Sequence, residues 1–363
     1  MKISDVKAHV LAIPIKQEEL PTPWIWGAFN QIIVEIQTDE GLTGYGEAYG
    51  YGTPRATAAV IDEVLKPMLL GEDPSQIAAL HDRMYRQTHL FGRYGITTFA
   101  ISGIDIALWD IAGKAAGVPL HRLLGSAITS QVEAYASLVR YPEPEQVRVV
   151  ALHAKEAGYT AVKLHQLDVE SIRVSREAVG SEIRLMMDIN CAWTPEQALD
   201  MARRLAPYAL FWLEEPLWPP EDFKGLARLA ELSGVPVATG ENACTVYQFQ
   251  AMLEARAASY IQPSVIKVGG ISEWRKIAAL AETYNVTIAP HSPYFGPGLS
   301  ATAHLVAAAP RVGLLECLYV ALEASVFKEP PRIEEGHFLL PQGPGLGLEI
   351  DPEVLARYRK QGD

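Results

Sequence analysis

RLMMDIN (184–190), FWLEEP (211–216) and VATGEN (237–242) are short apolar segments, each with a carboxylate at or near its end. The carboxylates Asp188, Glu214 and Glu241 stand 26 and 27 residues apart, which is the spacing of successive strand–helix units. In a closed parallel barrel the strand ends converge on one mouth, so we expect these side chains to meet. Three carboxylates repel one another unless a cation lies between them, and hard oxygen ligands suit Mg²⁺. The segments therefore predict a parallel α/β barrel with a divalent-metal site.

The chain from residue 131 to residue 318 alternates between strand and helix patterns. Helical segments such as 195–205 and 272–284 separate most of the candidate strands. These strands are 131–138, 160–165, 184–190, 209–215, 235–241, 259–264, 286–291 and 313–318. Eight units with a modified last unit predict a modified TIM barrel, (β/α)7β, over residues 126–325.

Residues 1–125 predict a smaller α+β capping domain, because three strands precede a mostly helical region. The strand patterns cover 2–15, 31–39 and 44–48, and the helical pattern runs from about Ala56 to Gly117. The Pro- and Gly-rich segment 326–363 is too irregular to be another barrel unit. We expect it to return to the capping domain.

The composition narrows the class of protein. The chain has 363 residues, of which 49% are hydrophobic, and a net charge of −12, which argues against a nucleic-acid partner. No apolar run reaches the roughly 18 residues of a membrane span, and the charged N-terminus is unlike a signal peptide. Three widely spaced cysteines do not form a disulfide framework and fit a reducing cytoplasm. These features predict a cytoplasmic protein with a small-molecule partner and no membrane partner.

Further polar residues lie at the ends of the other predicted strands, at intervals similar to those between the three carboxylates. Side chains at positions i and i+2 of a strand share a face, so Lys163 and His165 should point into the mouth together, as should Asp188 and Asn190. Ser264, His291 and Glu316 extend the ladder at intervals of 23 to 27 residues. Glu215 is an alternative to Glu214 as the metal ligand, and we favour Glu214.

Of the three carboxylates, Glu214 and Glu241 stand in Glu-Glu-Pro and Gly-Glu-Asn contexts, and all three follow the Lys163-x-His165 pair. Three further motifs are QPSVIKVGG (262–270), Pro290-His291 and SGIDIALWD (102–110). In this order and spacing, these motifs resemble the mandelate racemase subgroup of the enolase superfamily over nearly the whole chain.

The resemblance implies that a base removes the proton next to a substrate carboxylate, giving an enediolate that a metal and a cation stabilise. Superfamily sites use a lysine or histidine base with Mg²⁺, here one ion per subunit. By resemblance Asp188, Glu214 and Glu241 would bind the metal, and Lys163 would neutralise the substrate carboxylate. His165 and His291 would face the α-carbon from opposite sides.

The resemblance also suggests how the substrate is held and how the chain assembles. Glu316 would hydrogen-bond the carboxylate, and Asn190 and Ser264 would contact substrate. The cap segments near 17–30 and 47–56, including Trp26, would close over it. The protein would be a homo-oligomer, either a dimer or an octamer.

Two positions depart from the subgroup pattern. His165 stands where many members have a second lysine, and an imidazole beside cationic Lys163 should stay largely neutral and ready to act as a base. Ser264 stands where the subgroup usually has an aspartate paired with the histidine, so His291 should be a weaker base or need another partner. The muconate-lactonizing subgroup would place a lysine at position 264.

The reaction predicted from the resemblance is dehydration of a sugar acid to a 2-keto-3-deoxy acid. A racemase or epimerase, or a cycloisomerase acting on a lactone, is the alternative, because two bases on opposite faces of one carbon also suit inversion. A non-catalytic sugar-acid binding protein remains a further alternative. For the two histidines, the alternatives to a catalytic role are a substrate contact for His165 and a structural role for His291. Aromatic residues in the cap segments would imply a less polar substrate if they line the pocket.

Overall fold

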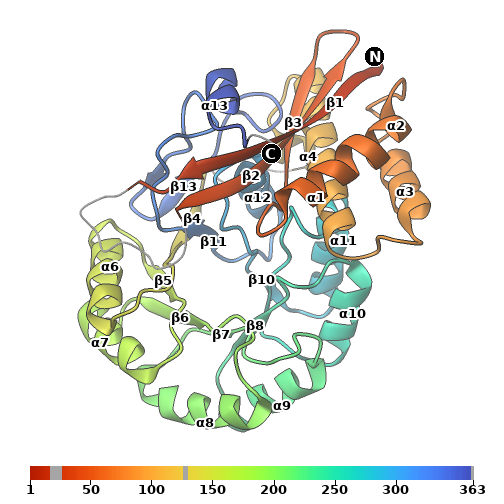
Figure 1. The fold of residues 1–363 in the computed structure, drawn as a ribbon. Helices are drawn as coiled ribbons and strands as arrows, with labels where there is room; N and C mark the ends of the chain where they lie inside the picture. Colours follow the sequence, from red (N-terminus) through yellow and green to blue (C-terminus); the bar gives the residue numbers. More distant parts are fainter. Residues whose placement is uncertain (17–26, 126–129, 361–363) are drawn as a thin grey trace.

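The computed structural model describes residues 1–16, 27–125 and 130–360. Figure 1 shows a ring of helices around the barrel strands, with the N-terminal part of the chain, in red and orange, against one side of this ring. The predicted fold, a modified TIM barrel with an α+β cap, is confirmed. The exact boundaries at 125/126 and 325/326 stay predictions.

The cap begins with an antiparallel sheet in the order β1-β2-β3. Its strands are β1 (Ile3–Pro14), β2 (Ala28–Thr38) and β3 (Thr43–Ala48). The helices that follow are α1 (Pro54–Ala59), the π-helical η1 (Val60–Leu65), α2 (Lys66–Leu69), α3 (Ile77–Thr88), α4 (Ile96–Ala116) and α5 (Leu120–Leu123). Helix α4 lies so close to β3 that a Cβ on Gly46 would be 2.0 Å from the Gly103 carbonyl oxygen, so the contact requires glycine.

Helix α4 is apolar on most faces because it is buried. Within the described part of the chain it is the one helix long and apolar enough, by length and composition, to cross a membrane. However, 78% of its most apolar window is covered by the rest of the protein. Helix α4 packs on β3 and on the barrel helix α11. This packing joins the cap to the barrel. This placement explains the all-round apolar pattern.

Eight parallel strands form the barrel, each pairing with the next from β4 to β10. The strands are β4 (Gln131–Ser137), β5 (Ala161–Leu164), β6 (Arg184–Asp188), β7 (Leu213–Glu214), β8 (Val237–Thr239), β9 (Tyr260–Ile261), β10 (Thr287–Ile288) and β11 (Leu315–Leu318). The last strand, β11, pairs with the first, β4, and a short parallel bridge between Ile288 and Val312 links β10 to the segment before β11.

Seven helices connect these strands and cover the outside of the barrel. They are α6 (Pro144–Glu156), α7 (Val169–Val179), α8 (Pro195–Leu205, continued by the 3-10 turn η2, Ala206–Tyr208), α9 (Phe223–Ser233), α10 (Val246–Glu254), α11 (Gly270–Thr283) and α12 (Pro297–Ala308). The two helical segments named in the sequence analysis, 195–205 and 272–284, correspond to α8 and α11. Seven helices between eight strands are the predicted (β/α)7β order.

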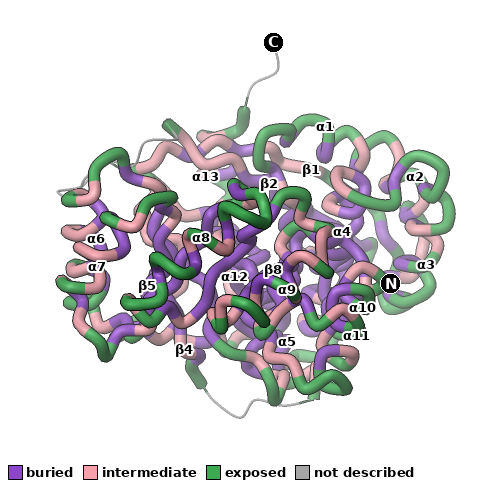
Figure 2. Tube along the Cα trace, turned by 90° about the horizontal axis from the view of Figure 1, so that it is seen from below, coloured by how far each residue is buried: buried purple, intermediate pink, exposed green. Residues whose placement is uncertain are grey.

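Two apolar layers hold the barrel together. The larger lies between strands and helices and includes Leu185 and Met187, as the alternation in β6 predicts. The smaller fills the barrel interior with Tyr135, Ala161, Met186, Trp212, Ala238, Ala289 and Leu314. In Figure 2 the buried trace lies in the interior, and exposed segments lie mostly along the outer helices and loops. The inner layer fills the barrel below the carboxyl ends of its strands, so a site at the mouth does not continue through the barrel.

After β11 the chain returns to the cap. The hairpin of β12 (Ile333–Glu334) and β13 (His337–Leu339) pairs with the first residues of β4, 131–133, and α13 (Pro352–Arg357) follows. Val326, Phe327, Ile350 and Leu355 pack against Leu11, Ile13 and Ile33 of the cap sheet. Figure 1 shows this blue segment beside the red strands.

Candidate active site

Asp188, Glu214 and Glu241 meet at the mouth of the barrel, as the sequence predicts. One carboxylate oxygen from each lies within 4.8 Å of the others. Asp188 and Glu214 are paired positions at the ends of β6 and β7, and Glu241 follows β8 by two residues. Asp188 and Glu214 are fully buried, whereas Glu241 is partly open to the cavity above. Three acidic groups so close together form a site for a hard cation.

Lys163 lies directly beneath this cluster with no solvent exposure. Its Nζ is 2.6 Å from Glu214 Oε1, 2.8 Å from Glu316 Oε1 and 3.5 Å from Asp188 Oδ2. Burial alone would lower the pKa of Lys163, but the charges of Glu214 and Glu316 raise it well above its ordinary value. The lysine therefore supplies a permanent positive charge at the mouth.

The acidic groups respond differently to this environment. Burial opposes ionisation of Asp188, but the charges of His165 and Lys163 hold its pKa below its ordinary value. For Glu316, burial is likewise outweighed by Lys163 and His291, and its pKa falls to about 2. Burial raises the pKa of Glu214 well above its ordinary value, despite Lys163, because other carboxylates surround it. Without a cation the cluster thus holds more negative charge than its lysine can balance.

Glu214 and Glu215 point to different places. Glu214 faces the cluster and accepts a hydrogen bond from Trp212 Nε1 at 2.8 Å. Glu215 has a left-handed backbone with φ of 44°, and its Oε1 accepts hydrogen bonds from Gly240 N at 2.9 Å and Thr239 Oγ1 at 3.0 Å. Burial, followed by the charge of Glu241, raises the pKa of Glu215 to about 7. The geometry favours Glu214 as the ligand.

His165 enters the site from the end of β5. Its Nδ1 is hydrogen-bonded to the carbonyl oxygen of Leu138, and its Nε2 lies 3.0 Å from Asp188 Oδ2. The carbonyl can only accept, so Nδ1 carries a proton and Nε2 is the nitrogen that faces the site. Asp188, in addition to Lys163, is therefore a charged neighbour of His165. The neutral state of His165 stays a prediction.

His291 enters from the loop after β10, on another side of the mouth. Its Nε2 lies 3.1 Å from Glu241 Oε2. Burial lowers the pKa of His291, opposed by the charges of Glu241 and Glu316. Its Nδ1 is 3.3 Å from the hydroxyl of Tyr294, which is also hydrogen-bonded to Ser264. The partner of His291 on its Nδ1 side is therefore a neutral one.

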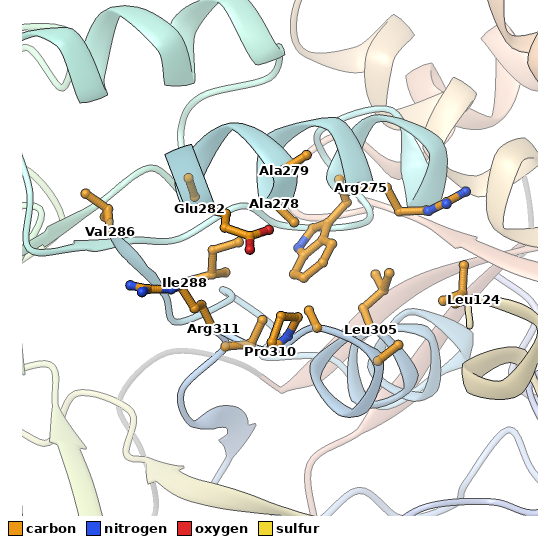
Figure 3. A pocket seen from close by; sticks show the side chains of 15 residues that line it. Leu124, Arg275, Ala278, Ala279, Glu282, Val286, Ile288, Leu305, Pro310 and Arg311 are labelled. Atoms are coloured by element: carbon orange, nitrogen blue, oxygen red, sulfur yellow. The ribbon is translucent and has the colours of Figure 1, made fainter. Parts of the chain in front are cut away.

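A cavity of about 740 Å³ lies between the cap and the barrel mouth. Both histidines, Glu241 and Glu316 open into it. The cap contributes Asn30, Glu47, Tyr49 and Tyr51, and the barrel adds Arg140 and Asn190. A second pocket of about 190 Å³ lies between α11 and the carboxyl-terminal part of α12 with the loop that follows it (Figure 3). It contains none of the predicted site residues, so the candidate active site is the larger cavity.

The chain matches two family models that together cover most of its length. Residues 27–125 match the mandelate racemase/muconate lactonizing enzyme N-terminal domain, and residues 146–354 match the enolase C-terminal domain-like family. The chain belongs to the mandelate racemase and muconate lactonizing enzyme family. Membership confirms the resemblance that the spacing of the acidic ladder indicated.

Curated and structural relatives in this family are similar over nearly the whole chain. Arabinonate dehydratase of Saccharolobus solfataricus is 36% identical over 339 residues, covering 90% of each chain. D-galactarolactone cycloisomerase of Agrobacterium fabrum is 33% identical over 383 residues, covering 99% of each. A magnesium-bound racemase structure from Streptomyces coelicolor superposes with a TM-score of 0.87, at 32% identity, covering 99% of this chain and all of the other.

The acidic cluster fits the divalent cation that this family implies. The fully buried Asp188 Oδ2 accepts no hydrogen bond of ordinary geometry from the described residues, although His165 and Lys163 lie near it. Unsatisfied buried carboxylate oxygens are costly, and a cation at the centre of the cluster would satisfy this atom. Asp188, Glu214 and Glu241 would hold the ion.

Three substrate-binding predictions meet different outcomes. Asn190 lines the cavity, but through a left-handed turn with φ of 48° after β6 ends at Asp188, so the strand alternation invoked for it does not reach it. Ser264 has no solvent exposure and does not line the cavity, because its hydroxyl is engaged by Tyr294. Its predicted substrate contact therefore does not match its placement. Trp26 lies outside the described residues.

Several cavity residues were not predicted from the sequence. Tyr294 lies only three residues after His291, and the serine at position 264 was the available signal that His291 needs another partner. Arg140 follows β4, and its Nε donates a hydrogen bond to the His165 carbonyl at 2.7 Å. Glu47, at the end of β3, is buried against the start of α12, where Gly298 N donates to its Oε2 at 2.8 Å. Neither Arg140 nor Glu47 belongs to the series of regularly spaced strand-end residues from which the other site residues were predicted.

Proposed function

We propose that this protein catalyses Mg²⁺-dependent removal of the proton next to a carboxylate, and that the reaction is dehydration of a sugar acid to a 2-keto-3-deoxy acid. One observation carries the proposal. His165 and His291 open into the same cavity as the acidic cluster, with a buried lysine beside that cluster. This arrangement provides bases, a fixed positive charge and a metal site within one enclosed space.

Lys163 and the three metal-binding carboxylates would stabilise the negative charge that develops on the substrate. Lys163 is protonated and buried, so it would stabilise negative charge that grows on the substrate carboxylate during proton removal. Mg²⁺, when bound by Asp188, Glu214 and Glu241, would supply further stabilisation of the same charge. Because this charge is larger in the transition state than in the substrate, these interactions accelerate the reaction.

His165 is the base that the contacts favour. Leu138 holds the proton on Nδ1, so Nε2, which lies 3.0 Å from Asp188 Oδ2, is the nitrogen that would accept the α-proton. His291 stands at a different strand end and could donate a proton to a β-hydroxyl group as it leaves as water. The resulting enol would then tautomerise to the 2-keto-3-deoxy acid. Arg140, Asn190 and Glu47 give the cavity polar groups suited to a polyhydroxylated acid.

A racemase or epimerase, or a lactone cycloisomerase, is the second candidate. It is supported by the same pair of histidines and by the similarity to D-galactarolactone cycloisomerase. Proton return to the opposite face of the α-carbon needs no residue beyond those already in the site. A homo-oligomeric assembly, dimer or octamer, stays a prediction.

The test is proton exchange in D₂O. The protein with Mg²⁺ would be incubated with a panel of sugar mono- and diacids and their lactones, each followed by proton NMR. Loss of the α-proton together with a new deoxy methylene signal would support the dehydratase. Deuterium incorporation or a new isomer without loss of water would favour the second candidate. Absence of exchange with every compound would contradict both.

A further inference from the structure

Tyr294 forms a bridge between Ser264 and His291. Its hydroxyl lies 2.7 Å from the carbonyl oxygen of His291 and 3.3 Å from His291 Nδ1, and it makes a short hydrogen bond with Ser264 Oγ. The carbonyl can only accept, so the phenol proton points to it. The two lone pairs of the phenol oxygen then accept from the Ser264 hydroxyl and from the His291 Nδ1–H. All three polar contacts of Tyr294 are thereby satisfied.

This arrangement determines which nitrogen of His291 faces the reaction. With Nδ1 donating to Tyr294, Nε2 is the ring nitrogen directed toward Glu241, at 3.1 Å, and toward the cavity. The tyrosine and histidine rings also pack edge to face, with centroids 5.9 Å apart and an interplanar angle of 72°. Tyr294 and Ser264 are both almost fully buried, so the bridge is shielded from water.

We propose that Tyr294, held by Ser264, is the positioning residue of His291, and replaces the aspartate partner that the subgroup places at position 264. This proposal rests on the proposed function of His291. A catalytic histidine requires a partner on its second nitrogen to fix the tautomer and the direction of the ring. Here a phenol oxygen fills that position.

A neutral partner suits the charge at this mouth. Glu241 and Glu316 already lie near His291, and a further buried carboxylate at position 264 would add a negative charge to the cluster. The phenol fixes the ring without that charge. It therefore orients His291 but does not stabilise its imidazolium form as a carboxylate would.

The test compares Tyr294→Phe, Ser264→Ala and the double variant Tyr294→Phe with Ser264→Asp. The substrate is the compound that exchanges its α-proton in the D₂O panel. We expect Tyr294→Phe to lower kcat by about 10- to 100-fold, with KM changed by less than about threefold, because a misdirected base slows the chemical step. The double variant, which supplies the aspartate of the subgroup, should recover at least about tenfold in kcat. A role in packing alone predicts no recovery by a carboxylate.

Two controls keep the comparison specific. Tyr159→Phe removes the hydroxyl of another buried tyrosine, which precedes β5 at the opposite end of the barrel, and should leave kcat unchanged. Thermal unfolding of each variant would show that it is folded. If Tyr294→Phe does not fold, Ser264→Ala tests the same bridge from its other end, with a smaller expected loss of kcat.

Crystal structures of the variants provide a readout that does not depend on activity. The proposal predicts that the His291 ring turns away or becomes disordered in Tyr294→Phe. In the double variant, the ring should return to its wild-type position when the carboxylate introduced by Ser264→Asp contacts Nδ1. The proposal is overturned if Tyr294→Phe keeps the kcat of the wild type, or if kcat falls while the ring stays in place. It is also overturned if the carboxylate contacts Nδ1 and activity does not recover. If no compound in the panel exchanges, the proposed function fails, and the ring position still decides the role of Tyr294.

Discussion

Lys163 and Glu316 form a buried ion pair across the seam where the barrel closes, with Nζ 2.8 Å from Oε1. Lys163 belongs to β5 and Glu316 to β11, and β4 lies between them. Ser137 of β4 donates a hydrogen bond to the same oxygen of Glu316 at 2.7 Å. Lys163 and Ser137 have no solvent exposure, and Glu316 has almost none although it lines the cavity. The pair therefore sets the charge of the site, and loss of one partner would leave the other buried and unpaired.

Replacing Lys163 tests the stabilising part of this role. Lys163→Met leaves Glu214, Glu316 and Asp188 without their buried counter-ion, and such a loss costs about 3–5 kcal/mol. We expect a decrease of this size in the free energy of unfolding, measured with urea at pH 8 in the presence of EDTA. Lys267→Met is the matched control. Lys267 is also buried, but among the described residues no carboxylate lies at ion-pair distance from it, and its ammonium packs over the Tyr49 ring. Equal losses in the two variants would contradict the prediction.

The assignment of the metal ligands predicts opposite results for two adjacent residues. Glu214→Gln should weaken Mg²⁺ binding by at least about tenfold, because it removes one of three charged ligands. Glu215→Gln should retain binding, since Glu215 is directed to Gly240 and Thr239 instead. Isothermal titration calorimetry would give both affinities. The stabilisation by added Mg²⁺, about 2.7 kcal/mol at 100 times the dissociation constant, is an independent check. Loss of binding in Glu215→Gln alone would reverse the assignment.

The two candidate bases predict distinct exchange results. His165→Gln should slow α-proton exchange by about 10²- to 10⁴-fold, the usual contribution of a general base. His153→Gln is the control, because His153 is exposed on α6 and contacts only Tyr319 among the described polar groups, with Nδ1 2.7 Å from its hydroxyl. Exchange would be followed by proton NMR in D₂O with the substrate found in the panel. Normal exchange in His165→Gln would assign the base to His291.

Glu47 predicts a pH dependence of stability. Burial raises its pKa from 4.5 to about 7, opposed by hydrogen bonds from Gly298 and Gly296. The folded protein therefore binds this proton more tightly than the unfolded chain. The associated stability is complete below pH 4.5 and is lost as the pH rises toward 7.

The measurement is the free energy of unfolding at pH 5 and pH 8 for the wild type and Glu47→Gln. Between these values the wild type should lose roughly 2–3 kcal/mol more than the variant, which cannot ionise at this position. Glu196→Gln, an exposed glutamate in the first turn of α8, should behave like the wild type. Parallel pH profiles for the wild type and Glu47→Gln would show that Glu47 does not ionise in this range.

The regular part of the fold was predictable because each strand–helix unit repeats a spacing. Asp188, Glu214 and Glu241 come together as that spacing requires, and Leu185 and Met187 face the helices as alternation requires. Most of the predicted strands were longer than the observed ones, at one end or at both. The chain leaves the strand at Asn190 and Glu215 through left-handed turns, and such turns are not visible in a pattern of apolar residues.

The contacts between units were harder to predict. The hydroxyl of Tyr294 replaces a missing carboxylate from a different strand end, and Glu47 reaches the barrel from the cap. Both depend on how separate elements pack, which a single sequence does not specify residue by residue. The placement of Ser264 behind Tyr294, away from the cavity lining, has the same origin.

Closure of the barrel by β11 has a consequence for how this protein is made. The strand that carries Glu316 is the last of the eight, and it pairs with the first. A growing chain that has left the ribosome only as far as the loop after β10 already contains the acidic cluster and both histidines. Its parallel sheet is still open, and β4 and β10 expose unpaired edges that invite pairing with other chains. During synthesis there is therefore an interval in which nearly all the candidate catalytic residues have been made, while the sheet that carries them still has unpaired edge strands.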